Sequence, residues 1–154
     1  MTSVDSTKDS EKIVTTAGGV QMTVAELRAR VSVVEPGVIL MREIDQGTPE
    51  TLAIMGNALK EAAREMEVYG IVLDLEDSSG NISAEYRRFI PSYFDELWKA
   101  SEGSFKLLAV AFSGNPVSRV VTKFLIGRML DLPFTIEKDV EQATEAVRSR
   151  LRAG

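Results

Sequence analysis

The alternation of polar and apolar residues predicts an antiparallel hairpin early in the chain. Residues 28–35 alternate in polarity and residues 38–44 are mostly apolar, with Pro36 and Gly37 between them. A Pro-Gly pair favours a tight turn, because proline presets one backbone angle and glycine accepts a positive φ. We therefore expect two paired strands that add an antiparallel edge to a sheet.

Residues 1–27 are predicted to form an N-terminal tail that is partly disordered. Residues 1–12 are rich in Ser, Thr, Asp and Lys, a composition that buries too little apolar surface to fold. The pieces 13–16 and 20–24 are β-prone and flank a Gly-Gly turn, which is the pattern of a short hairpin. One globular domain is expected over residues 28–152.

Apolar side chains at spacings of three and four residues predict amphipathic helices. The first helix has Thr48 as its N-cap and Pro49 at its first position, and Gly70 is expected to end it. The second covers residues 82–98 and contains Pro91, which is expected to kink or divide it because proline lacks the backbone N–H.

Two further helices and three strands complete the predicted order. Helices are expected at 117–129 and 140–151, the latter capped by Asp139. The apolar runs that predict strands are 71–75, 105–112 and 132–136. Because βαβ crossovers are right-handed and short, these strands should be parallel. The chain is therefore predicted to have an α/β fold of order ββαβαβαβα, with an open, mixed and mostly parallel sheet of about five strands and four helices.

The composition excludes several classes of function. The net charge is −5 and the pI is near 4.9, so no basic surface for nucleic acid is expected. The chain has neither cysteine nor histidine, which excludes thiol nucleophiles, zinc sites built on these residues and imidazole acid–base catalysis. We expect a protein that is not an enzyme, needs no cofactor and binds other proteins.

The hydropathy of the chain argues against a membrane protein. No apolar run approaches the roughly 20 residues of a membrane span, and residues 1–12 hold no apolar stretch of signal-peptide length. A cytoplasmic location is therefore expected, and the absence of cysteine agrees with that compartment.

The end of the third predicted strand is the most informative segment. Residues 74–77 are Asp-Leu-Glu-Asp, and they precede Ser78, Ser79 and Gly80 just before the second helix. The two hydroxyls could cap that helix by accepting its unpaired N–H groups. They could instead be phosphorylated, since a phosphate brings about −1.5 to −2 charges and is favoured at a helix N-terminus. The carboxylates could hold Mg²⁺, although a solvated acidic loop is the simpler interpretation.

The second predicted helix carries a broad apolar face. Its members are Ile82, Tyr86, Phe89, Ile90, Tyr93, Phe94, Leu97 and Trp98. Their helical spacing favours burial in the core. The alternative is a pocket for an apolar ligand or a surface for a partner, which an excess of exposed aromatic side chains would mark.

Four motifs, taken in this order, make residues 28–151 resemble the STAS domain of bacterial anti-sigma factor antagonists, which has the SpoIIAA-like fold. The motifs are Gly-Thr-Pro-Glu at 47–50, the central strand Val-Leu-Asp-Leu at 72–75, Asp-Ser-Ser-Gly at 77–80, and a last strand that leads into Val-Glu-Gln-Ala at 140–143.

The resemblance implies a regulatory role. In that family the serine of Asp-Ser-Ser-Gly is phosphorylated by a cognate anti-sigma kinase, phosphorylation blocks binding, and a phosphatase restores it. Carried over, the first candidate acceptor is Ser78 and the second is Ser79, while Asp77, Gly80 and Asn81 are candidate partner contacts.

Two kinds of protein remain open after this resemblance. The expected partner of a STAS domain is an anti-sigma kinase or a related regulator. A related SpoIIAA-like branch also has an acidic Asp-Leu-Glu-Asp strand end, as at residues 74–77, but lacks a conventional phosphoserine. A protein of that branch would bind a small apolar ligand or form a homodimer.

Overall fold

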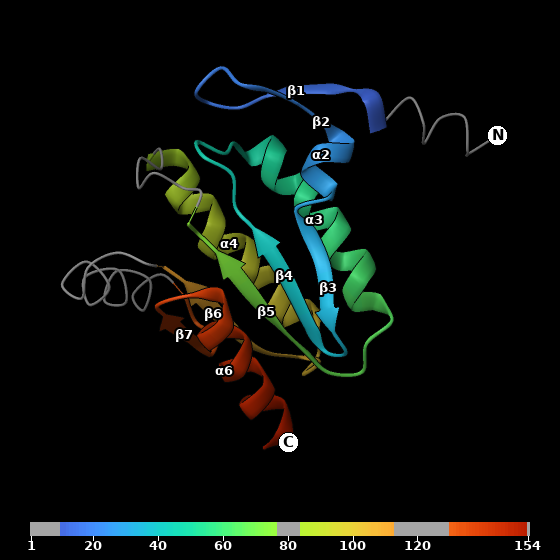
Figure 1. Cartoon of the computed structure of the whole chain (residues 1–154), viewed down its shortest axis with the longest axis vertical. Helices are drawn as coiled ribbons and strands as arrows, with labels where there is room; N and C mark the ends of the chain where they lie inside the picture. The colour runs from blue at the N-terminus through green and yellow to red at the C-terminus, as the bar shows by residue number, and fades with distance from the viewer. Residues whose placement is uncertain (1–9, 77–83, 113–129, 154) are drawn as a thin grey trace.

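The computed structural model describes residues 10–76, 84–112 and 130–153, which form a two-stranded and a five-stranded sheet with helices on both faces of the larger one (Figure 1). The elements are β1 (Ile13–Thr15), β2 (Gln21–Thr23), α2 (Val24–Arg28), β3 (Val31–Glu35), β4 (Val38–Arg42), α3 (Pro49–Arg64), β5 (Tyr69–Asp74), α4 (Ala84–Ala100), β6 (Phe105–Ala111), β7 (Phe134–Glu137) and α6 (Val140–Arg152).

The five-stranded sheet has its strands in chain order, β3-β4-β5-β6-β7. β3 and β4 pair antiparallel, and β4 to β7 are parallel. Gly37 turns the chain between β3 and β4 with a φ of +84°, an angle that favours glycine. The predicted α/β class and its open, mixed and mostly parallel sheet are confirmed. The predicted helix at 117–129 lies outside the described residues.

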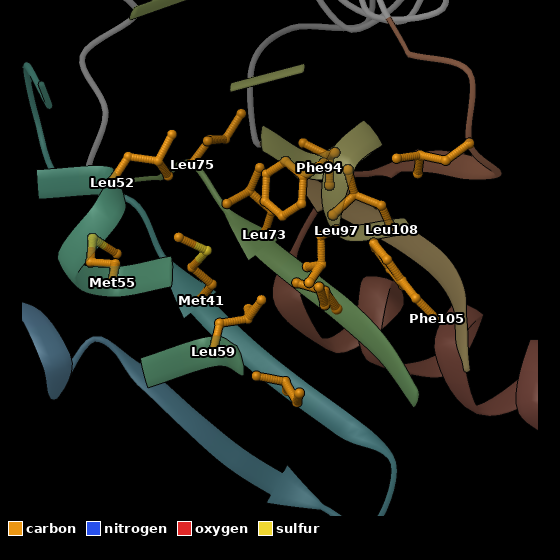
Figure 2. Close-up of a cluster of buried hydrophobic side chains, with 14 of the residues drawn as sticks. Met41, Leu52, Met55, Leu59, Leu73, Leu75, Phe94, Leu97, Phe105 and Leu108 are labelled. Carbon is orange, nitrogen blue, oxygen red and sulfur yellow. The ribbon is translucent and has the colours of Figure 1, made fainter. Parts of the chain in front are cut away.

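The two faces of this sheet are covered differently. Right-handed crossovers between neighbouring parallel strands bring successive helices to one face, and there α3 and α4 enclose the main core (Figure 2). Met41 and Leu73 point from the strands toward Met55 of α3 and Phe94 of α4. Among the described helices, only α6 packs on the opposite face (Figure 1). A second, smaller core lies between α6 and the sheet.

The predicted helix starts are confirmed by their side-chain hydrogen bonds. The Thr48 hydroxyl accepts from the Thr51 backbone N–H at 3.1 Å, and the Thr51 hydroxyl accepts from the Thr48 N–H at 2.8 Å. At the start of α6 the Asp139 carboxylate accepts from the Gln142 N–H at 2.8 Å. Each contact satisfies a donor that a helix terminus otherwise leaves unpaired.

The predicted strand start at residue 28 is wrong. Thr23 and Glu26 form a capping box, with both hydrogen bonds at 3.0 Å, and it starts the short helix α2 that ends at Arg28. The hairpin predicted upstream is confirmed as β1 and β2. Val14 of β1 and Leu27 of α2 are buried in the main core, so this region is packed against the domain.

The prediction that Gly70 ends a helix is wrong, because Gly70 lies inside β5. α3 already ends at Arg64. An added Cβ at Gly70 would lie 2.5 Å from Cγ1 of Val147, a distance that no real Cβ contact tolerates. The glycine therefore allows α6 to approach the sheet closely, which is a tertiary requirement.

Pro91 does not divide the second predicted helix. α4 runs from Ala84 to Ala100 with the proline inside it and buried. Ile90 packs against the core on one side of the proline, and Phe94 is buried on the other. Tertiary packing of an amphipathic face supplies most of the stability of a protein helix, and here it holds the helix together across the missing hydrogen bond.

Candidate functional site

The carboxyl ends of the four parallel strands lie in one row. The register pairs Arg42 with Asp74, Asp74 with Ala111, and Ala111 with Glu137, and these are the last residues of β4, β5, β6 and β7. Ligand and partner sites of open α/β sheets form at this edge, because the loops that leave the strands converge there. The candidate site is therefore this carboxyl edge of the sheet.

Backbone hydrogen bonds extend the sheet by one residue past that row. The Glu43 N–H donates to the Asp74 carbonyl at 2.9 Å, and the Leu75 N–H donates to the Ala111 carbonyl at 3.0 Å. The Phe112 N–H donates to the Glu137 carbonyl at 2.9 Å. The bases of the loops at the carboxyl edge are thus held in fixed relative positions.

Asp74 holds the chain where it leaves β5. Its carboxylate oxygen Oδ1 accepts from the backbone N–H of Glu76 at 2.9 Å, a bond typical of aspartate in turns. The Glu76 side chain is exposed. Residues 10–76, 84–112 and 130–153 contain no group of three or more acidic side chains that could hold a metal ion, and the carboxylate Asp77 of the magnesium hypothesis lies outside them.

Glu43 is a buried carboxylate that the sequence analysis did not single out. Its side chain is 1% exposed, and its Oε1 accepts from the Ile44 N–H at 2.9 Å. A carboxylate this deeply buried is uncommon in proteins unless it has a partner. The signal in the sequence was a glutamate within the mostly apolar run 38–44.

The residues predicted to form the site all lie outside the described part of the chain. These are Ser78 and Ser79 as phosphate acceptors, with Asp77, Gly80 and Asn81 as partner contacts. The described residues on either side are Glu76, after β5, and Ala84, where α4 begins. Segment 77–83 therefore connects the carboxyl edge to the start of α4.

The apolar face of α4 divides between core and surface. Phe94 is fully buried and Leu97 is 8% exposed, while Tyr93 and Trp98 pack partly against the core. The prediction that this face is mainly core is confirmed for these four residues. Phe89 differs, because 46% of it is exposed in the part of α4 that follows segment 77–83. Its exposed ring is apolar surface on the first half of α4.

Comparison with solved structures gives a relative of the fold. The chain is similar to the NMR structure of the protein TM1081, with a TM-score of 0.51 and 18% sequence identity over 77% of this chain and 86% of that one. An identity this low shows the fold alone. No protein-family model and no curated protein sequence matches the chain. Within the described ranges, no helix is both long and apolar enough to cross a membrane.

Proposed function

We propose that this protein is a non-enzymatic, cytoplasmic bacterial regulator of the STAS type, which binds a protein partner through the carboxyl edge and is switched by phosphorylation of Ser78. The observation that carries the proposal is the level row of strand ends. β5 leaves that row at Asp74 and leads through the Asp-Ser-Ser-Gly segment into a helix with an exposed Phe89. The SpoIIAA-like fold suggested by the sequence motifs is consistent with the sheet order.

The charge distribution at this edge supports a switch that acts by repulsion. Glu76 is exposed and Asp77 follows it in the sequence. A phosphate on Ser78 would add about −1.5 to −2 charges beside them. A partner that contacts Phe89 and this segment would then meet a strongly negative surface, and an acidic partner surface would be repelled. A kinase or an anti-sigma regulator that binds the unmodified form would dissociate.

The proposal is tested with full-length protein and with the ATP-binding anti-sigma kinases encoded in the same genome. We expect one of them to transfer phosphate to the wild type and not to Ser78→Ala, as measured by phosphopeptide mass spectrometry. Ser78→Asp should weaken binding of that kinase at least about tenfold, since like charges across an interface cost affinity. Phe89→Ala should weaken it as well.

A matched control separates the site from a general charge effect. Ser149 is exposed on α6, and Ser149→Asp adds the same charge away from the carboxyl edge. It should leave binding unchanged. The proposal is wrong if no candidate kinase binds the wild type, or if Ser78→Asp and Ser149→Asp weaken binding equally.

The second candidate, a SpoIIAA-like module that binds an apolar ligand or forms a homodimer, has less support from the packing. Phe94, one of the aromatic side chains that would line a pocket on α4, is already used in the main core. A rise of the melting temperature with fatty acids, without phosphorylation at Ser78, would favour that candidate instead.

A further inference from the structure

A groove of about 730 Å³ lies at the amino ends of the parallel strands, at the other end of the sheet from the carboxyl edge. It is bordered by β3, by the Pro36–Gly37 turn, by the end of α3 and by Leu151 of α6. Its apolar lining consists of Val33, Pro36, Ala62, Met66, Val68 and Leu151. Val33 is 50% exposed and Val68 is 43% exposed, so the groove offers apolar surface to a binding partner.

β3 beside this groove is an edge strand. It pairs with β4 on one side, and in the described part of the chain no strand pairs with its other side. The Arg42 N–H donates to the Arg30 carbonyl, so the backbone groups of Arg30 point toward β4. Along an antiparallel strand, residues whose backbone groups point toward the partner strand alternate with residues whose groups point away from it. The N–H and C=O groups of Val31 and Val33 therefore point away from the sheet.

This edge has few of the features that protect edge strands from pairing. Natural edges carry lysine, proline or inward charges, whereas residues 31–34 are Val-Ser-Val-Val. The register shift between Val33 and Glu35 limits the regular edge to its first residues. The one charged side chain, Glu35, is held by Arg148 of α6 at 2.8 and 3.0 Å. An extended segment can therefore reach the outward groups of Val31 and Val33.

The groove has an acidic rim, which decides between possible occupants. Glu61, Glu65 and Glu67 line it. Glu61 is paired with Arg28, but Glu65 and Glu67 form no ion pair with any described residue. A second copy of this chain would bring the same carboxylates to the joint edge, where they would repel. A segment with lysine or arginine would neutralise them.

We propose that β3 and this groove bind an extended segment of a partner protein that carries both apolar and basic side chains and adds a strand to the sheet. Main-chain hydrogen bonds to Val31 and Val33 supply the pairing, as in other cases of strand addition. An apolar side chain of the segment covers Val33 and Met66, and basic side chains meet Glu65 and Glu67. This surface is separate from the carboxyl edge, so one molecule can bind two proteins at once.

The test uses two labelled nine-residue peptides in which every second residue is threonine. The other positions alternate lysine with valine in one peptide and glutamate with valine in the other, so that charged and apolar side chains share one face of the strand. Fluorescence anisotropy with the full chain should give binding of the lysine peptide that weakens with added salt. The glutamate peptide should not bind. Amide NMR shifts should concentrate at residues 31–35. Methylating alternate backbone nitrogens of the lysine peptide should weaken binding about fivefold for each hydrogen bond lost.

Four variants locate the site. Glu65→Lys with Glu67→Lys should weaken binding of the lysine peptide about tenfold or more. Glu96→Lys with Glu141→Lys, exposed changes of the same sign and total size on α4 and α6, should leave it unchanged and serves as the matched control. Val33→Pro should weaken binding because it removes an outward N–H while keeping the inward ladder. Ser78→Asp should have no effect, so this proposal and the proposed function fail independently.

Several outcomes would overturn the proposal. The strand-addition model is wrong if neither peptide binds at millimolar concentration, if both bind equally, or if the methylated lysine peptide binds as well as the parent. Sedimentation of the free protein tests whether a second copy of this chain occupies the edge. A wild-type dimer that becomes a monomer in Val33→Lys would assign the edge to a second copy.

Discussion

The two faces of the central sheet are built on different principles. Toward α3 and α4 the strands present large side chains, among them Ile39, Met41 and Leu73, and Phe94 fills the space between the layers. Toward α6 the buried side chains of the strands are mostly valine and alanine, such as Val72 and Ala109, with Leu40 the largest in that cluster. The first face is stabilised by filled volume and the second by close approach of one helix to the backbone. The same strands serve both faces, because successive side chains point to opposite sides.

This difference predicts opposite responses to mutation. On the face of α3 and α4, removing volume should be the damaging change, because it leaves a cavity. On the face of α6, adding volume should be the damaging change, because there is no space for it. The predictions below test this contrast from the largest expected effect to the smallest.

Phe94→Ala should reduce the free energy of unfolding by about 3–5 kcal/mol, the range for truncating a fully buried phenylalanine. Phe94 is 0% exposed and makes an edge-to-face contact with Tyr93 at 5.3 Å between ring centroids. Urea unfolding measures the change. Phe89→Ala on the same helix is the control, since 46% exposure should limit its cost to less than about 1 kcal/mol. Equal losses in the two variants would contradict the assignment of Phe94 to the core.

Gly70→Ala should cost about 1–3 kcal/mol through overpacking. Without a clash, replacing a glycine inside a strand should stabilise the protein by about 0.5–1 kcal/mol, so the sign of the change is decisive. Val147→Ala removes the atom that would lie 2.5 Å from the new Cβ. The double variant should therefore be less destabilised than the sum of the single ones. Strictly additive losses would mean that the glycine is not required by α6.

Tyr93→Phe should leave stability unchanged or raise it by up to about 1 kcal/mol, because it removes a buried hydroxyl that has no hydrogen-bond partner among the described residues. Burial raises the pKa of Tyr93 to about 12. The folded state then holds the phenol proton more tightly than the unfolded state does. Stability from this group is complete below the unfolded pKa and is lost as the pH rises from about 10 to 12. That alkaline loss should be smaller in Tyr93→Phe, as followed by urea unfolding at each pH.

Arg148→Gln should have the smallest effect, a lowered melting temperature at neutral pH and low salt. Arg148 connects α6 to the end of β3, and its hydrogen bonds hold the pKa of Glu35 and of Glu145 below the usual carboxyl range. Stability from a lowered carboxyl pKa is present at neutral pH and is lost as the pH falls through the folded value. The gap between wild type and variant should therefore close in acid and in 1 M salt. Arg150→Gln, an exposed change on the same helix, should show no such gap.

Local signals in the sequence were sufficient wherever neighbouring residues make the decisive contact. Thr48 and Asp139 cap helices by bonding the backbone three residues on, and Gly37 takes a positive φ within its own turn. These positions were predicted correctly because the partners are close along the chain. The capping box of Thr23 and Glu26 carried the same kind of signal, which the alternating pattern around it obscured.

Local sequence signals gave wrong predictions where the residue that determines the structure is distant along the chain. Gly70 resembled a helix terminus, but Val147 of α6 determines its role. Pro91 resembled a break, but the core on both sides of it holds α4 together. For the same reason the burial of Glu43, the exposure of Phe89 and the groove beside β3 could not be predicted, since each depends on which elements meet in space.

The sequence by itself determined the α/β class, the order of the described strands and the starts of α3 and α6, because apolar periodicity and capping act over a few residues. It also determined that the carboxyl end of β5 leads into the acidic Asp-Ser-Ser-Gly segment. Only the tertiary structure decided that one face of the sheet is filled with large side chains while the other is closed by α6. It also decided that each edge of the sheet offers a different surface, because exposure is a property of the packed molecule and not of any residue alone.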